Sequence, residues 1–437
     1  MKPTLESLRP CLDGAIPAVI GTCARDGTPN AAYVSQVHYV DAEHVALSYQ
    51  FFSKTRVNVL EHPYAQVQVI EPGSFRHFRL KLHYVRTETS GPLFEYMKAQ
   101  LAGIAAHSSM DKVFVLKGAD IYRVHDIESV DAHVPPAPLA SDTLLRLRRA
   151  LDVLGDEADL ATLADRALAA LAQGFDIRHA LLLMLDETGN ALYTLASLGY
   201  TDSGVGAEVV LGEGVIGVAA RERIPIRINY RTGDYTYQAA IRAANASEPG
   251  IRLPVLAEPH SQIAIPLCHG GRLIGVLYAE SEHEAFFSHN DEDALVVYAR
   301  YLAALVIAHA ADTDAPDAVI SDAPTEPAQP TGKPLAVCYF SLDHSVFIDN
   351  DYLIKGVAGS ILWTLLNEYA ASGRRDFCNR ELRRDPRLPL PDFGDNLETR
   401  LILLQRRLAE RCPAIVLEKT GRGRFRLRVD RPLHFTS

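Results

Sequence analysis

The arginines near the C-terminal end are the residues whose spacing most clearly predicts a chemical role. Asp395 to Leu408 reads DNLETRLILLQRRL, in which leucines recur at four-three-four spacing and form the apolar stripe of an amphipathic helix. Asp395 can cap this helix, and Glu398 three residues later completes a capping-box pattern. Thr420 to Val429 then alternates basic and apolar residues behind two glycines, as a half-buried strand after a tight bend would. A helix and a hairpin that both carry arginines suit a surface that binds nucleic acid.

The elements upstream must position and control this surface. The chain has 437 residues, enough for about three domains of ordinary size, and 48% of them are apolar, so each domain could bury a core. No run of 18 apolar residues occurs, and Met1 to Cys11 lacks an apolar signal region, so we expect neither a membrane span nor a secretory signal. The six cysteines lack CxxC spacing, which predicts no disulfide framework, no cysteine-rich metal site and a cytoplasmic location.

Charge is spread unevenly along the chain. From Leu335 onward there are 17 lysines and arginines against 13 acidic residues, a balance of +4, which leaves −14 for the rest of a chain whose net charge is −10. A basic C-terminal region on an otherwise acidic chain is compatible with a protein that binds nucleic acid through its C-terminal end alone.

Two proline-containing segments, His133 to Ala140 and Asp312 to Pro334, divide the chain. We therefore expect domains at residues 1–138, 139–312 and 335–437, with a flexible linker at 313–334. The expected fold is multidomain α+β. The resemblances given below imply that it consists of a split β-barrel, an α/β/α sandwich and a winged helix.

The first region reads mostly as strands. Phe78 to Thr87 alternates apolar with polar residues, a short helix starts at Ser53, and a longer helix covers Pro92 to Ala106. Lys117-Gly118 predicts the turn of a final hairpin. Many short strands with two helices indicate a small barrel.

This region, from about Ile16 to Val130, resembles the FMN-binding split barrels of the pyridoxamine-phosphate oxidase type. The likeness rests on IPAVIGTCARDGTPNAAYVSQV and HVALSYQFFSKTRVNVLEHPYAQVQVI. It implies ring contacts from Tyr33, Ser35 and Gln36. It also implies phosphate contacts from a second group: Ser53, Lys54, Thr55 and Arg56. Hydroxyls, a cation and free amides at a helix N-terminus together favour a dianion.

Other ligands remain open for this region. The oxidase's basic substrate-binding residues are not found, so that activity is not implied. Relatives of the barrel also bind haem or deazaflavin, and His38, His77 and His83 keep haem as an alternative. The structural alternative is that Ser53 only caps its helix, while Lys54 and Arg56 are solvated.

The middle region, Thr143 to Asp312, resembles a GAF domain, as its GEGVIGVAA, IAIPL and RLIGVLYAES segments indicate. The resemblance implies a small ligand between the sheet and the following loops, and a set of candidate pocket residues: Tyr230, Tyr235, Tyr237, His260 and Gln262. No cysteine stands where a bilin would attach, and the NKFDE-type signature of cyclic-nucleotide GAF domains is incomplete. Many GAF domains instead bind nothing and act as dimerising spacers.

Val337 to Val429 resembles the winged-helix effector domain of response regulators. The resemblance implies that Thr399, Arg400 and Leu403 face the major groove. It puts the remaining arginines near phosphates or at the wing tip: Arg406, Arg407, Arg422 and Arg424. Arginine suits both tasks because its planar group binds guanine edges or phosphates at two points. Ile402 and Leu403 are unusually apolar for such a helix, so the alternative is a face that binds another protein or dimerises.

These expectations combine into a hypothesis of a one-component transcription regulator that senses redox state or a small ligand, pairs as a homodimer and binds DNA. The alternatives are an FMN-dependent oxidoreductase with regulatory modules, and a ligand-free scaffold. No acid–base pair or nucleophile motif stands out, so the sequence names no catalytic residue and leaves enzymatic activity undecided.

Overall fold

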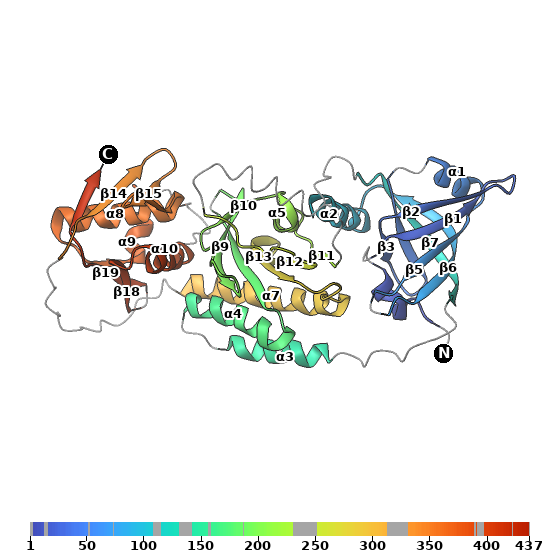
Figure 1. Cartoon of the computed structure of the whole chain (residues 1–437), viewed down its shortest axis with the longest axis horizontal. Coiled ribbons are helices and arrows are strands. Elements are labelled where there is room, and N and C mark those ends of the chain that lie inside the picture. Colours follow the sequence, from blue (N-terminus) through green and yellow to red (C-terminus); the bar gives the residue numbers. More distant parts are fainter. Residues whose placement is uncertain are drawn as a thin grey trace.

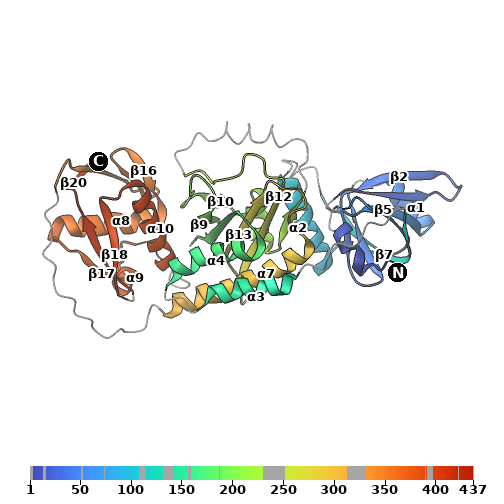
Figure 2. The ribbon, with the colours of Figure 1, turned by 60° about the horizontal axis from the view of Figure 1, so that its bottom comes forward.

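The computed structural model describes residues 3–12, 16–50, 53–72, 74–107, 115–130, 142–155, 159–186, 188–229, 251–312, 331–388, 390, 397–421 and 423–436. These parts form three units, called here the N-terminal unit (up to residue 130), the middle unit (142–312) and the C-terminal unit (331–436). The middle unit lies between the other two along the longest axis of the molecule (Figures 1 and 2).

The N-terminal unit is built on one antiparallel sheet that curls around its own core, with strand order β2-β1-β5-β6-β7-β4-β3. Its strands are β1 (Ala18–Cys23), β2 (Pro29–Val34), β3 (Val37–Tyr39), β4 (His44–Tyr49), β5 (Tyr64–Ile70), β6 (His77–Glu88) and β7 (Gly118–Ser129). In β6 the apolar Phe78, Leu80 and Leu82 are buried, whereas Arg79 and Lys81 between them are half-exposed. The period of two in the sequence therefore sets which face of the strand meets the core.

Three helices accompany this sheet: η1 (Glu6–Cys11), α1 (Ser53–Glu61) and α2 (Pro92–His107). Met97 and Leu101 of α2 pack with residues of β4 and β7. The same helix contacts the middle unit, where Gln100 Nε2 donates to the Pro225 carbonyl oxygen at 2.5 Å. Gly103 makes this approach possible, because a Cβ there would lie 2.4 Å from Cγ2 of Ile226.

The hairpin predicted at Lys117-Gly118 is not formed. Gly118 instead begins β7, a single strand between β6 and β4. The glycine that indicated a turn serves a close approach, because a Cβ there would lie 2.6 Å from Cγ2 of Thr87.

The middle unit is an antiparallel sheet with order β10-β9-β8-β13-β12-β11. Its strands are β8 (His179–Leu185), β9 (Ala191–Leu198), β10 (Glu208–Val210), β11 (Ile226–Ile228), β12 (Ser261–His269) and β13 (Arg272–Ser281). Helices α3 (Thr143–Leu154), α4 (Leu160–Phe175) and α7 (His289–Asp312) cover one face, and α5 (Gly214–Glu222) covers the other (Figure 1). Burial on both faces explains why β8 is apolar from Ala180 to Leu185. Gly275 is needed where strands meet, because a Cβ would lie 2.1 Å from the Leu183 carbonyl oxygen.

The C-terminal unit has two small sheets and three helices. The first sheet has order β16-β15-β14-β20 and contains β14 (Leu335–Phe340), β15 (Ser345–Ile348), β16 (Asp351–Ile354) and β20 (Leu433–Thr436). The second has order β17-β19-β18 and contains β17 (Asp376–Cys378), β18 (Ile415–Gly421) and β19 (Arg424–Val429). The helices are α8 (Gly356–Ser372), α9 (Asn379–Arg384) and α10 (Leu397–Arg411).

The arginine-bearing helix and hairpin expected from the sequence are therefore present as α10 and β18–β19. Asp395 lies outside the described residues, so its capping role stays a prediction. Among the described helices, none is long and apolar enough to cross a membrane.

We expect Leu365→Ala to destabilise the C-terminal unit by about 2–5 kcal/mol, because it deletes a fully buried side chain and leaves a cavity. Urea denaturation followed by the fluorescence of Trp363, the chain's single tryptophan, measures this unit selectively. Trp363 stacks on Tyr339 at 4.6 Å between ring centroids, so its emission reports local packing. The matched control is Leu342→Ala, which changes a side chain that is 98% exposed. Equal loss in both variants would contradict the described packing.

Candidate functional site

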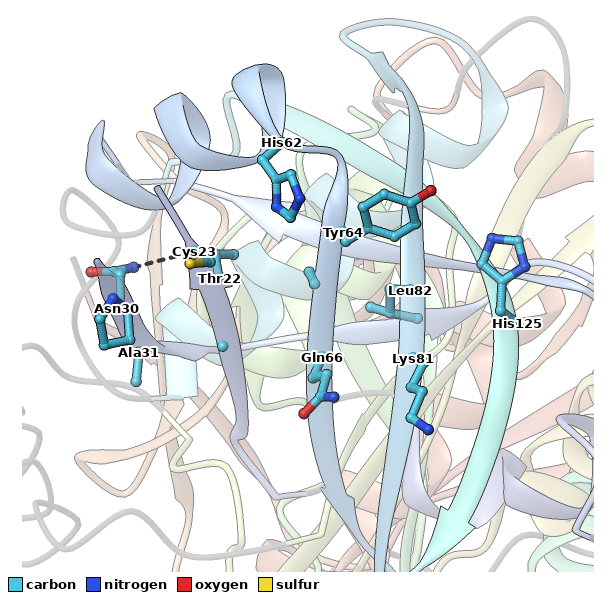
Figure 3. Close-up of a pocket in the computed structure, with 13 residues that line it drawn as sticks. Thr22, Cys23, Asn30, Ala31, His62, Tyr64, Gln66, Lys81, Leu82 and His125 are labelled. Carbon is cyan, nitrogen blue, oxygen red and sulfur yellow. Dashed lines mark hydrogen bonds between the residues drawn. The ribbon is translucent and has the colours of Figure 1, made fainter. Parts of the chain in front are cut away.

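A hollow of about 970 Å³ lies on the outer face of the N-terminal sheet. Strands β1, β2, β5, β6 and β7 contribute to its wall (Figure 3). The lining residues that carry polar or reactive groups are Thr22, Cys23, Asn30, His62, Tyr64, Gln66, Lys81 and His125. A wall that mixes apolar surface with a few such groups is typical of small-molecule sites.

A hydrogen-bond cluster joins one edge of the hollow to α1. Asn30 Nδ2 donates to the hydroxyl oxygens of Thr55, at 2.9 Å, and Thr22, at 3.3 Å. Asn58 Nδ2 also donates to Thr22, at 3.1 Å. Thr55, predicted to bind phosphate, is buried within this cluster. Its hydroxyl therefore helps to hold α1 against the edge of the hollow.

Aromatic and imidazole rings line up across the opposite edge of the hollow. Ring centroids lie 5.4 Å apart for His62 and Tyr64, 5.1 Å for Tyr64 and His83, and 5.8 Å for His83 and His125. Lys81 beside them donates to Asp126 at 3.2 Å and to Glu128. These hydrogen bonds, Glu128 first, raise the pKa of Lys81. The hollow thus offers planar surfaces next to a paired cation.

Arg56, a second predicted phosphate ligand, already forms an ion pair and a hydrogen bond within the protein. Its Nη1 donates to Asp120 Oδ1 at 2.7 Å and to the Thr87 hydroxyl at 2.9 Å, and its guanidinium lies 4.5 Å from the Tyr49 ring centroid. Burial alone would lower the Arg56 pKa, but the Asp120 carboxylate raises it by more. Because Asp120 neutralises this cation, Arg56 is a weaker phosphate ligand than the sequence indicated.

The predicted ring contacts Ser35 and Gln36 lie in a different place, where Gln36 lines a small pocket together with Tyr96 and Met97 of α2. Gln50 Nε2 donates to Ser35 Oγ at 3.2 Å. Gln36, Ser48 and Gln50 are 5%, 2% and 3% exposed, and within the described part of the chain Gln36 Oε1, Ser48 Oγ and Gln50 Oε1 have no hydrogen-bond partner. Buried unpaired polar atoms are costly, so this group fits a ligand or water that pairs with them.

The remaining predicted cofactor residues are exposed or only partly described. Tyr33 is 76% exposed on β2, on the same face as Ala31, which lines the hollow. Lys54 is exposed at the start of α1, and the side chain of Ser53 lies outside the described residues. The seven predicted residues are therefore spread over the hollow, the start of α1 and the side of the sheet near α2, rather than gathered at one point.

The middle unit holds a second polar group on the sheet face that α5 partly covers. Gln262 is buried, and among the described residues its Oε1 has no partner. Its cross-strand neighbour Glu280 is also buried and accepts from Tyr200 at 3.0 Å, Tyr278 at 2.9 Å and the Leu256 amide at 2.5 Å. Burial, together with this carboxylate, raises the pKa of Tyr200.

Sequence reasoning missed Glu280, Tyr200 and Tyr278. A carboxylate within the apolar run LIGVLYAES was the signal that could have found them. His260, also predicted, is half-buried beside Glu284, with 3.5 Å between Nδ1 and Oε1. The other predicted pocket residues lie outside the described part of the chain: Tyr230, Tyr235 and Tyr237.

The predicted DNA-reading face of α10 is turned toward protein. Thr399, Arg400, Leu403 and Arg407 are buried, and Arg406 is half-buried. The expectation of an open arginine face is thus corrected for this arrangement, because α10 lies against the middle unit as well as its own core. Contact of these residues with DNA stays a prediction that requires α10 to leave this position.

Arg407 has a structural role that the sequence did not indicate. Its Nε donates to the Leu353 carbonyl oxygen at 3.0 Å, and Nη1 donates to Glu410 at 3.2 Å. Burial lowers the Arg407 pKa, although Glu410 offsets part of this. This side chain ties α10 to β16 within the C-terminal unit.

Other cations of the C-terminal unit remain exposed. Arg424 is exposed at the start of β19, opposite Cys378 of β17. The Asn379 amide donates to the Gly423 carbonyl oxygen at 2.8 Å, so α9 begins beside the tip of the hairpin. Arg380 and Arg384 on α9 are exposed too and were visible in the sequence as the basic run NRELRR. Arg422 lies outside the described residues.

Residues 157–306 match the family model of the GAF domain. The middle unit contains a GAF domain. This family suggests a sensory or regulatory role, and it accounts for the segments GEGVIGVAA and RLIGVLYAES noted in the sequence. A comparison with curated proteins gave no match.

Solved structures similar to parts of the chain include an FMN-binding protein from Syntrophomonas wolfei subsp. wolfei. It has 18% identity and a TM-score of 0.26, and the match covers 30% of this chain and 88% of that one. The GAF domain of a phosphoenolpyruvate-protein phosphotransferase from Acinetobacter has 20% identity and a TM-score of 0.33, with 41% and 100% covered. Free methionine-R-sulfoxide reductase from Neisseria meningitidis, in complex with its substrate, has 22% identity and a TM-score of 0.32, with 41% and 99% covered. Likeness at this level assigns no residue a role here.

The thiols of the N-terminal unit should differ sharply in reactivity. Burial, aided by Glu71, raises the pKa of Cys11 to about 12, so at pH 8 only about one Cys11 in ten thousand is a thiolate. Cys23 lines the hollow, where a small reagent can reach it. We expect iodoacetamide to modify Cys23 well before Cys11, as followed by peptide mass spectrometry, with Cys23→Ser as the control. Equally fast modification of Cys11 in the folded protein would argue against its described burial.

Proposed function

We propose that this chain is a one-component transcription regulator. In this proposal a split barrel (residues 1–138) binds a flavin-type cofactor, and a GAF domain (139–312) relays the signal or adds a second one. A linker (313–334) then leads to a winged-helix domain (335–437) that binds DNA. The observation that carries the proposal is that α10, the predicted reading helix, rests directly on the GAF sheet: the Arg400 guanidinium lies 3.7 Å from the ring centroid of Tyr193 in β9.

A GAF domain in contact with an effector helix supports regulation rather than catalysis. A ligand that changes the packing of the GAF sheet would change the energy of that contact, and a ligand can shift an equilibrium only through such a difference. The buried pair Gln262 and Glu280 offers one acceptor that has no partner among the described residues and one carboxylate that accepts from two tyrosine hydroxyls. Such a group suits a small polar ligand with hydrogen-bond donors.

The residues of the N-terminal unit fit a flavin mononucleotide at two points. The exposed Lys54 and the first amides of the nine-residue helix α1 suit a phosphate. The side-chain oxygens of Gln36, Ser48 and Gln50, which have no partner in the described part of the chain, suit the hydrogen-bond donors of a flavin ring. A bound flavin would supply a ring whose charge depends on redox state, while these residues would bind and orient it. Haem and deazaflavin are the alternatives.

A second copy of the chain is part of the proposal. Val19, Tyr33 and Tyr64 are large apolar side chains exposed on the outer face of the N-terminal sheet. A homodimer that covers this face would remove them from water, and it would present two winged helices to paired DNA half-sites.

The DNA-binding part rests on the exposed cations that the structure gathers near the tip of the hairpin. Arg424 is the first residue of β19, and Arg380 and Arg384 lie on α9, which starts beside the same tip. Exposed arginines on a hairpin and a neighbouring helix suit phosphates on both sides of a groove.

Lys54→Ala should weaken FMN binding about tenfold, because a hydrogen bond to a charged group contributes about 1.5 kcal/mol. The measurement is a titration of the purified chain followed by quenching of flavin fluorescence. The matched control is Lys98→Ala, which removes an exposed lysine from α2 and should leave the affinity unchanged. Equal affinity in all three proteins would contradict the phosphate site. NADPH-driven turnover of the loaded chain would favour the oxidoreductase alternative.

Arg424→Ala should weaken DNA binding and lower the slope of log affinity against log salt by about one, because one phosphate contact is lost. Fluorescence anisotropy with genomic fragments at several salt concentrations measures both quantities. Arg148→Ala, which removes an exposed arginine of α3, is the control and should leave the slope unchanged. Absence of DNA binding at low salt in every protein would favour a scaffold that binds a protein partner.

A further inference from the structure

The contact between α10 and the GAF domain combines buried apolar side chains with specific hydrogen bonds and ion pairs. Leu403 is 3% exposed, and its Cδ1 would lie 3.5 Å from a Cβ on Gly206 of the middle unit. Ile402 is buried too, and it lines a cavity of about 300 Å³ together with Ala161 and Thr162 of α4. The two apolar residues that looked out of place on a DNA-reading helix therefore have a partner within the same chain.

Tyr193 of β9 holds the first turn of α10. Its hydroxyl donates to Thr399 Oγ1 at 2.7 Å, and the Arg400 guanidinium stacks on its ring at 3.7 Å from the centroid. A guanidinium over an aromatic face is attracted by the ring's negative face, and burial strengthens this attraction. Arg400 is only 7% exposed, so it cannot reach DNA from this position.

Arg406, two turns further along, is bound at three points by the middle unit. Its guanidinium donates to the Leu195 carbonyl oxygen at 2.8 Å, the Ala161 carbonyl oxygen at 3.2 Å and the Asp165 carboxylate at 2.7 Å. These acceptors come from β9 and α4. They occupy the guanidinium N–H donors with which an arginine would otherwise bind a phosphate.

Two further ion pairs cross the same boundary with the same polarity. Lys355 Nζ lies 2.9 Å from Glu208 Oε2, and Lys419 Nζ lies 3.8 Å from Asp159 Oδ2. In each pair the acid belongs to the middle unit and the base to the C-terminal unit, as with Asp165 and Arg406. The middle unit thus offers carboxylates to bases that a DNA backbone would otherwise attract.

We propose that the GAF domain competes with DNA for α10, so that the docked arrangement is autoinhibited and the two partners exclude each other. This inference rests on the proposed DNA binding. If only the undocked fraction of molecules is competent, the apparent affinity for DNA is reduced by that fraction. Hydrogen bonds and ion pairs contribute to this interface, so changes in the middle unit can shift the balance.

The test uses the full chain with changes confined to the middle unit. Asp165→Lys combined with Glu208→Lys reverses two exposed acids of the docking surface without touching any predicted DNA contact. The matched control, Asp152→Lys combined with Glu43→Lys, makes the same change of charge at exposed sites elsewhere. Tyr193→Phe is a third variant, which removes the hydrogen bond to Thr399 and leaves the net charge unaltered.

Hydrogen exchange of the α10 amides reports docking, and fluorescence anisotropy reports DNA affinity. We expect Asp165→Lys/Glu208→Lys to raise exchange in α10 and to tighten DNA binding about fivefold relative to the control, as the loss of weak exposed ion pairs would allow. Tyr193→Phe should act in the same direction by about threefold, the equivalent of one lost hydrogen bond.

Each outcome bears on a separate claim. Faster exchange in α10 together with tighter DNA binding supports the competition. Unchanged exchange in both docking variants, or faster exchange with an affinity equal to that of the control, overturns it and leaves the proposed DNA binding intact. If no variant binds DNA at low salt while exchange in α10 rises, the proposed function fails, and the competition fails with it.

Discussion

The burial of α10 on two sides is the constraint on which the arrangement of this chain depends. Leu404 and Leu408 are buried in the core of the C-terminal unit, while Leu403, Thr399 and Arg400 meet the middle unit. One continuous apolar cluster therefore runs through both units. The helix cannot leave the GAF sheet without exposing leucine and isoleucine side chains to water, so undocking has a cost that a DNA or ligand contact must offset.

The polar groups suited to ligands lie on either side of a second inter-unit contact. The buried side-chain oxygens of Gln36 and Gln50 belong to the N-terminal unit, and Gln262 with Glu280 belongs to the GAF sheet. Helices α2 and α5 pack against each other between the two units. A ligand at either group would therefore act close to elements that both units share.

Much of this structure could be predicted from local pattern, and the failures are informative. Alternation in β6 and the leucine stripe of α10 gave the correct element types, because in each element the apolar residues recur at the period of that structure and are buried. The sequence pattern could not show what the other face of α10 contacts. Ile402 and Leu403 are compatible with a contact to another unit, and the pattern alone does not distinguish this from exposure to solvent or DNA. Arg56 and Arg407 were expected to bind phosphate groups of a ligand or of DNA. In the structure Arg56 instead binds Asp120, and Arg407 binds the Leu353 carbonyl oxygen. Partners brought together over long separations in the chain leave no local signal.

Because Gly103 has no side chain, it limits which substitutions the contact between the N-terminal and middle units can accept. Position 103 sits where α2 touches Ile226, and even an alanine there would force the two apart. A helix normally favours alanine over glycine, so retaining glycine costs local stability. A substitution at this single position would thus weaken the contact between the N-terminal and middle units. It would do so without changing any residue proposed to bind a ligand.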